Sequence, residues 1–211
     1  MIVHGATLSP FVRKVVVFAA EKGVELTVKP TGMGPKSPEF LAMSPFGKIP
    51  AFEDGDYKLA DSTAIVTYIE AKHPEPALIP AEARARGKAM WFDEYADTLL
   101  AGQLGTIFFQ RVVAPMVGLP QDLAAADQAE AELAPKHFAY LESVIPESGY
   151  LVEDRMTLAD VAVASPLVNM MHAGVAIDAG MYPRLAAYAT AMHARPSFTG
   201  VLAGELKMMG K

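Results

Sequence analysis

A proline-rich segment divides the sequence into two unlike parts. Residues 73–80 read His-Pro-Glu-Pro-Ala-Leu-Ile-Pro, and three prolines in eight residues make a stiff linker that excludes helix. Before this segment, short strand-like and helix-like patterns alternate, and from Ala81 on no strand pattern competes with helix. We therefore expect residues 1–75 to form a small α/β domain, residues 76–80 a linker, and residues 81–211 an all-helical bundle.

The first part predicts an open sheet of four strands with helices on it. Asp54-Gly55-Asp56 separates two strand-like runs and is typical of a hairpin turn. We expect strands at residues 1–4, 25–29, 51–53 and 57–60, and helices at residues 10–22, 37–43 and 62–72. In the second part we expect helices at residues 81–113, 121–145, 157–174 and 183–194, with Pro135 beginning or kinking a turn.

Composition and charge exclude several kinds of protein. The chain has 211 residues, of which 52% are hydrophobic and 20% charged, as expected for a globular protein with a full core. The net charge is −6 and no Lys/Arg cluster exceeds two residues, so we expect no nucleic-acid partner. The apolar runs are too short to span a bilayer and no signal peptide is evident, so we expect a cytoplasmic protein without a membrane partner.

Cysteine is absent from the sequence. This excludes a cysteine nucleophile, a disulfide and a thiolate metal site in the protein itself. No His/Asp/Glu cluster has the spacing of a metal site, so we expect no metal.

The motif Lys48-Ile49-Pro50 predicts a main-chain binding site. Pro50 precedes a strand-like run and cannot donate to a sheet ladder, so we expect a cis peptide bond in a tight turn. Such a turn leaves the backbone N–H and C=O of Ile49 free. A backbone in this state pairs with a short peptide as an added strand.

Two further motifs stand at predicted helix starts. Ser9 precedes Pro10 where the first helix begins, and Asp61-Ser62 opens the third. These side chains are either simple helix caps or parts of an anion site. As an anion site, Ser9 would donate to a ligand thiolate, while Ser62 would hold a ligand carboxylate and Asp61 an ammonium group. Both interpretations stay open from the residues alone.

Three cations near these motifs also have two interpretations. Lys36 and Lys48 are either solvated surface lysines or the positive charges that meet an anionic ligand. Arg13, one turn beyond Ser9, either acts on a thiolate through its charge or is a structural ion-pair partner.

Three stretches carry a family resemblance. "SPFVRKVVVFAAEKGVE" at 9–25, "KSPEFLAMSPFGKIPAFED" at 36–54 and "LADSTAIVTYI" at 59–69 occur in the order and spacing of a glutathione transferase. The linker and the helical part fit as well, and "TLADVAVAS" at 157–165 resembles the family's capping-box helix. The chain therefore resembles the serine-type classes phi, tau and theta. This resemblance implies a thioredoxin-like first domain and a helical second one.

The resemblance also implies roles for the motif residues. Ser9 lies where the serine-type classes keep the hydroxyl that activates the glutathione thiol. Ile49 would pair through its backbone with the cysteinyl unit, in a geometry enforced by cis-Pro50. No tyrosine lies near Ser9 in the sequence, so the tyrosine-type classes do not fit.

The two ends of glutathione have implied partners as well. Lys36 and Lys48 match positions that contact the glycyl end, and Asp61 and Ser62 match the pair that binds the γ-glutamyl group. Two departures stand out: Pro35 replaces a histidine that phi-like sequences often have, and Asp61 is one methylene shorter than the commoner glutamate.

The second substrate of this family, an electrophile, binds against the helical domain. We expect its pocket to include Phe11, Phe108 and Arg111. Alternatively, Phe108 is a core residue and Arg111 a solvated or ion-paired surface residue. Asn169 and His172 lie three apart on another predicted helix, where a lone histidine is more often structural than catalytic.

The sequence thus predicts a glutathione transferase that conjugates the glutathione thiolate to hydrophobic electrophiles. Glutathione is the co-substrate, and by resemblance the chain is expected to form a homodimer. Two alternatives stay open: a binding or regulatory protein of this fold without transferase activity, and a glutathione-dependent peroxidase or reductase. The absence of cysteine disfavours a mixed disulfide with the protein.

Overall fold

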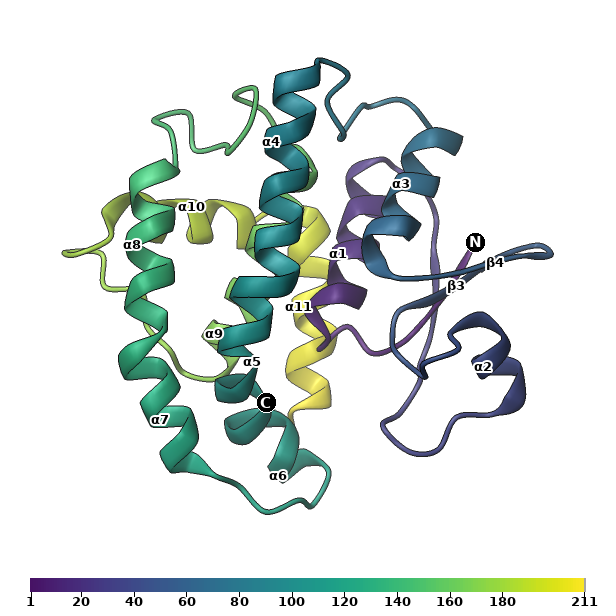
Figure 1. Ribbon diagram of the computed structural model, residues 1–211, viewed down its shortest axis with the longest axis horizontal. Helices are drawn as coiled ribbons and strands as arrows, with labels where there is room; N and C mark the ends of the chain where they lie inside the picture. Colours follow the sequence, from purple (N-terminus) through teal and green to yellow (C-terminus); the bar gives the residue numbers. More distant parts are fainter. Residues whose placement is uncertain (211) are drawn as a thin grey trace.

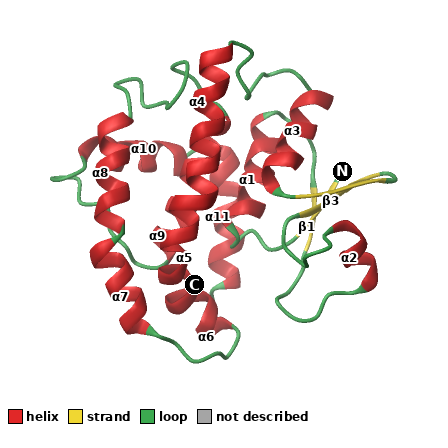
Figure 2. Cartoon of the chain, viewed as in Figure 1, coloured by secondary structure: helices red, strands yellow, loops and turns green. Residues whose placement is uncertain are grey.

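The computed structural model of the chain describes residues 1–210 and contains two unlike halves side by side. A small sheet with three helices occupies one half, and a helical bundle fills the other (Figure 1). Figure 2 shows that the strands are confined to the first half. The division into a strand-bearing and an all-helical part agrees with the sequence patterns.

The sheet has four strands in the order β2-β1-β3-β4. Strands β1 and β2 are parallel, and the other two pairs are antiparallel, which gives a mixed sheet. The predicted four-stranded sheet with helices on it is therefore confirmed. The strands are β1(Ile2–His4), β2(Thr27–Lys29), β3(Ala51–Asp54) and β4(Tyr57–Ala60), and the helices of this half are α1(Pro10–Glu21), α2(Pro38–Met43) and α3(Ser62–Lys72).

Helix α1 lies in the middle of the molecule. It contacts α3 and β1 in its own half and α9(Leu158–His172) and α11(Pro196–Met208) in the other. Its sequence explains this position, because the apolar run from Val15 to Ala19 leaves no polar face over that turn. Val15 and Phe18 are fully buried and belong to one core that runs through both halves.

Every named element of the second half is a helix, as predicted, but the expected long helix at 81–113 is not regular. Two π-helical segments interrupt it, and such segments often mark functional sites. Its parts are α4(Ala83–Glu94), η1(Tyr95–Leu100), α5(Ala101–Phe108) and η2(Phe109–Val113), followed by the short α6(Ala114–Met116).

The remaining helices follow the sequence prediction closely, with one omission. The stretch expected at 121–145 is divided at Leu133 into two helices, and Pro135 lies in the first turn of the second. Thr157 and Asp160 form the expected capping box at the start of α9. The further helices are α7(Leu123–Glu132), α8(Ala134–Val144) and α10(Pro183–His193), and α11 was not predicted.

Within residues 1–210, no helix has both the length and the apolar content needed to cross a membrane.

Candidate functional site

The sheet topology brings four loops to one edge. His4 on β1 lies opposite Lys29 on β2 and Ala51 on β3, and Ala51 lies opposite Ala60 on β4. The chain therefore leaves β1, β2 and β4, and enters β3, at the same edge of the sheet. The loops at this edge carry the residues singled out from the sequence: Ser9, Lys36, Lys48, Ile49, Pro50, Asp61 and Ser62.

Ser9 precedes α1, and its hydroxyl does not cap that helix within the described chain. Pro10 occupies the first turn, as expected. Ser37 has the same setting before α2, yet its hydroxyl accepts a bond from the Phe40 N–H at 3.3 Å. The hydroxyl of Ser9 is thus left available beside the N-terminus of a 12-residue helix, where the helix dipole favours an anion.

The turn before β3 has the predicted main-chain geometry. The Ile49–Pro50 peptide bond is cis. Among residues 1–210, Ile49 makes no backbone–backbone hydrogen bond, so its N–H and C=O are free to pair with a ligand. The hydroxyl of Ser44 donates to the carbonyl of Lys48 at 2.7 Å, which fixes the turn from inside. The side chain of Lys48 is exposed.

The start of α3 combines a cap with a buried hydroxyl. Asp61 has φ +79°, a conformation uncommon outside glycine, and its carboxylate accepts the Ala64 N–H at 3.0 Å. Asp61 therefore caps the helix. Ser62 is buried, and its hydroxyl donates to Asp97 of η1 at 3.2 Å. This bond links the start of α3 to the helical half.

A buried lysine holds this junction together. The Lys14 ammonium donates to Asp93 at 2.7 Å, to Asp97 at 2.6 Å and to the Thr63 hydroxyl at 3.1 Å. Burial raises the pKa of Asp97, and Lys14 opposes that rise. Sequence reasoning missed this cluster. The sequence feature that could have indicated it is the spacing of Asp93 and Asp97, because residues four apart lie on the same face of a helix.

The two lysines expected to meet an anionic ligand, Lys36 and Lys48, lie on separate loops. The Lys36 ammonium bonds to the carbonyl of Gly32 in its own loop and lies 5.4 Å from the centre of the Phe40 ring. It borders an open hollow of about 460 Å³ between this loop and α2. Neither Lys36 nor Lys48 forms an ion pair within the described residues, so both charges are available to an anionic ligand.

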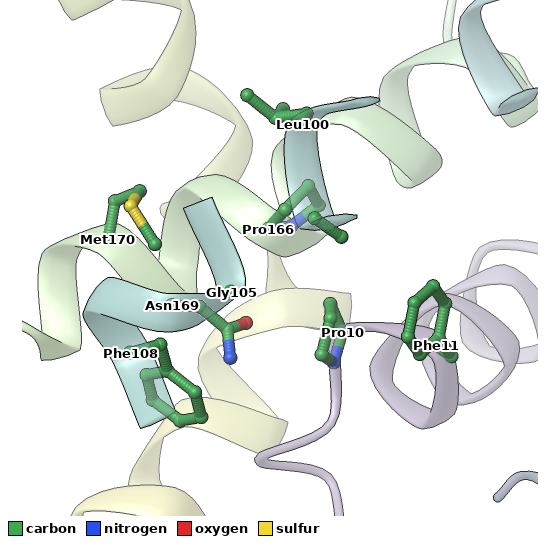
Figure 3. Close-up of a pocket in the computed structure, with 9 residues that line it drawn as sticks. Pro10, Phe11, Leu100, Gly105, Phe108, Pro166, Asn169 and Met170 are labelled. Atoms are coloured by element: carbon green, nitrogen blue, oxygen red, sulfur yellow. The ribbon is translucent and has the colours of Figure 1, made fainter. Parts of the chain in front are cut away.

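An apolar pocket of about 140 Å³ lies beside the first turn of α1. Phe11 and Phe108 lie on opposite sides of it, with Pro10 and Asn169 between them (Figure 3). Because Pro10 and Phe11 directly follow Ser9, the pocket adjoins the loop that carries the free hydroxyl. Its lining residues are Pro10, Phe11, Leu100, Ala101, Gly105, Phe108, Pro166, Asn169 and Met170.

Arg111 does not line this pocket, contrary to the expectation from sequence. Its guanidinium pairs with Asp127 at 2.7 Å and with Glu130, both on α7, and donates to the carbonyl of Ala173. These bonds raise the pKa of Arg111. Sequence spacing placed Arg111 on one face with Phe108, but η2 begins at Phe109 and breaks the regular helical spacing.

Arg13 is structural rather than catalytic in its contacts. It is fully buried, donates twice to Glu205 at 2.9 and 2.8 Å, and donates to the side chain of Asn169 at 2.6 Å. The Asn169 amide in turn donates to the carbonyl of Leu8 at 2.9 Å. This chain of bonds anchors the residue before Ser9 to the helical half.

Among residues 1–210, no group of three or more His, Cys, Asp or Glu side chains is placed to hold a metal ion.

Comparison with known proteins gives a consistent result. The family model "Glutathione S-transferase, N-terminal domain" matches residues 3–77, and "Glutathione S-transferase, C-terminal domain" matches residues 109–203. Glutathione S-transferase 3 of Zea mays is 32% identical over 206 residues, which are 95% of this chain and 92% of the relative. A glutathione S-transferase of Hyoscyamus muticus is 30% identical over 204 residues, which are 94% and 96% of the two chains.

A solved structure agrees with these sequence matches. The structure of glutathione S-transferase-I bound with lactoylglutathione superposes with a TM-score of 0.85 and 27% identity, over 96% of this chain and 98% of that one. The similarity therefore covers both halves of the chain and their arrangement. The chain belongs to the glutathione S-transferase family, with relatives among the plant enzymes.

Proposed function

We propose that this protein transfers glutathione to hydrophobic electrophiles, with Ser9 as the catalytic residue. The observation that carries the proposal is the Ser9 hydroxyl, which does not cap α1 and lies beside an apolar pocket, at the sheet edge where the other motif residues meet. The names of the relatives support the transferase activity. No observation favours a binding protein or a reductase instead.

Glutathione binds along the sheet edge in this proposal. The backbone of Ile49 pairs with the cysteinyl unit, because its N–H and C=O have no backbone partner in the described chain. Lys36 and Lys48 meet the glycyl carboxylate, and the start of α3 receives the γ-glutamyl group through Asp61 and Ser62. Asp97 and Lys14 support that end by fixing the Ser62 hydroxyl.

The chemistry requires a thiolate at neutral pH. The Ser9 hydroxyl donates to the thiolate sulfur, and the N-terminus of α1 favours its negative charge, so both lower the pKa of the bound thiol. The sulfur then attacks an electrophile held in the pocket beside Phe11 and Phe108. Proximity supplies the rest of the rate gain, because both reactants are held side by side.

Substitution at Ser9 tests the proposal. Ser9→Ala lowers the turnover of 1-chloro-2,4-dinitrobenzene by roughly tenfold or more and raises the pKa of the thiol of bound glutathione, measured by thiolate absorbance. Retention of the variant on immobilised glutathione stays unchanged. Ser37→Ala is the matched control, because Ser37 also precedes a proline at a helix start but caps its helix. Turnover in Ser9→Ala equal to that of wild type would refute the Ser9 assignment. Retention on glutathione without any conjugation by wild type would favour the binding-protein alternative.

The assembly and location belong to the same proposal. Phe46 lies on the loop before cis-Pro50 and is 90% exposed, and Leu41 nearby is 41% exposed. Exposed apolar side chains of this size favour burial against a partner, so we infer a homodimer. A role in cytoplasmic detoxification is the physiological setting that we propose for such an enzyme.

A further inference from the structure

The apolar pocket has the volume of a site for one small ring. A cavity of roughly 150 Å³ lined by apolar side chains binds one benzene molecule. The pocket here has about 140 Å³, and eight of its nine lining residues are apolar or glycine. Leu100 and Met170, which line it, are themselves buried at 0% and 2% exposure, so these walls are packed from behind.

The single polar side chain in the lining, Asn169, already has a protein partner at both its oxygen and its nitrogen. The Asn169 oxygen accepts from Arg13 at 2.6 Å, and its nitrogen donates to the Leu8 carbonyl at 2.9 Å. An electrophile with polar substituents would lose its hydration on entry and gain little in exchange. The pocket therefore suits an apolar group.

Gly105 on α5 leaves part of this volume open. It lines the pocket, and apart from its chain neighbours and the backbone of its own helix, a Cβ added to it would meet no heavy atom within 4 Å. Gly102 lies one turn earlier on α5, its added Cβ would also meet open space, and it does not line the pocket. Both glycines lie within α5, so replacing either with leucine raises the helix propensity of that position.

We propose that Gly105 sets the substrate class of this enzyme: its missing side chain makes room for electrophiles with one apolar ring and no larger group. This inference rests on the proposed function and adds the size limit and the residue that determines it. A benzyl halide is the model substrate. The glutathione thiol gives its proton to solvent, the sulfur forms a bond to the benzylic carbon, and the halide leaves with the electron pair of the broken carbon–halogen bond.

Binding of three glutathione thioethers to the purified full chain tests the inference. Calorimetry measures the affinity of S-methylglutathione, S-benzylglutathione and S-(1-naphthylmethyl)glutathione for wild type, Gly105→Leu and Gly102→Leu. In wild type we expect the benzyl compound to bind at least tenfold more tightly than the methyl compound, and the naphthylmethyl compound to lose that gain. In Gly105→Leu the benzyl-to-methyl ratio falls to about one, while Gly102→Leu keeps the wild-type ratio.

The outcomes separate the two levels of the proposal. If wild type binds the methyl compound but prefers the naphthylmethyl compound, or if Gly105→Leu keeps the wild-type ratio, the size limit is wrong and the glutathione site stands. A fall of the ratio in Gly102→Leu to the same extent also overturns the role of Gly105. If wild type binds none of the three compounds, the proposed function is wrong and the inference about Gly105 falls with it.

Discussion

Removing the carboxylate of Glu205 should destabilise the fold far more than removing a surface charge. Glu205 and Arg13 are both fully buried, and the two N–H groups that Arg13 directs at Glu205 lie 2.9 and 2.8 Å from its oxygens. His172 bonds to the same carboxylate at 2.8 Å. Burial opposes ionisation of Glu205, but the bonds from His172 and Arg13 outweigh it and lower the pKa of Glu205.

The expected magnitude follows from what Glu205→Ala leaves behind. Arg13 keeps its bonds to Asn169 and to the carbonyl of Ser165, but its charge has no counterion within the core. Breaking a buried ion pair by removing one partner costs about 3–5 kcal/mol. Since a whole domain is stable by only about 5–15 kcal/mol, this is a large share of the total.

Urea denaturation at a fixed protein concentration measures the effect. With an m value of about 3 kcal/mol/M, Glu205→Ala shifts the midpoint down by about 1–1.7 M. Lys29→Met is the comparison, because Lys29 pairs with Glu53 at the surface and loss of that pair costs about 1 kcal/mol or less. The double variant Arg13→Met/Glu205→Leu should recover most of the loss, since apolar side chains replace both charges.

A small effect would refute this reasoning. If Glu205→Ala costs no more than Lys29→Met, the guanidinium of Arg13 finds solvent or another partner in the variant. The two halves would then not depend on this pair for their packing.

Three further outcomes follow from the structure. Burial raises the pKa of Asp160 from 3.8 to about 6, so the folded state binds the proton of this carboxyl more tightly than the unfolded state does. As pH rises from about 4 to 6, the free energy of unfolding of wild type should therefore fall by on the order of 3 kcal/mol relative to that of Asp160→Asn, as measured by urea titration at each pH. Phe46→Ser should weaken the proposed dimer at least tenfold by light scattering at serial dilution. Asn169→Ala should lower turnover more than it raises the KM for glutathione, because it releases Leu8 while the binding loops stay in place.

Sequence patterns predicted the elements of the first half well, because each depends on local signals. The strands at β3 and β4 need only an alternating run and a turn at Gly55, which has the positive φ of +63° that a tight turn requires. The order of those elements then implied the sheet. The free main chain of Ile49 was predicted for the same reason, since a proline after it breaks the ladder.

The wrong prediction for Arg111 and the features that the sequence patterns missed have a different origin. Arg111 pairs with α7, and Lys14 with two carboxylates 79 and 83 residues away, and no local pattern encodes such partners. Helix α11 was missed although it supplies Glu205, which lies 192 residues from Arg13. A buried charge predicts that a partner exists, but only the packed structure says which residue it is.

The two Ser-Pro helix starts show the same limit within the proposed site. Ser9 and Ser37 have nearly the same φ, −73° and −69°, but ψ is 126° at Ser9 and 157° at Ser37. Only Ser37 caps its helix. The chain before Ser9 is held from outside by the Asn169 amide, which donates to the Leu8 carbonyl, and within its own loop by the Ser9 N–H, which donates to the Ala6 carbonyl. Whether a serine caps a helix or offers its hydroxyl to a ligand is therefore decided by contacts that the dipeptide does not contain. The Asn169→Ala variant tests this directly, because within residues 1–210 a side chain of the helical half hydrogen-bonds to the loop of Ser9 and none hydrogen-bonds to the loop of Ser37.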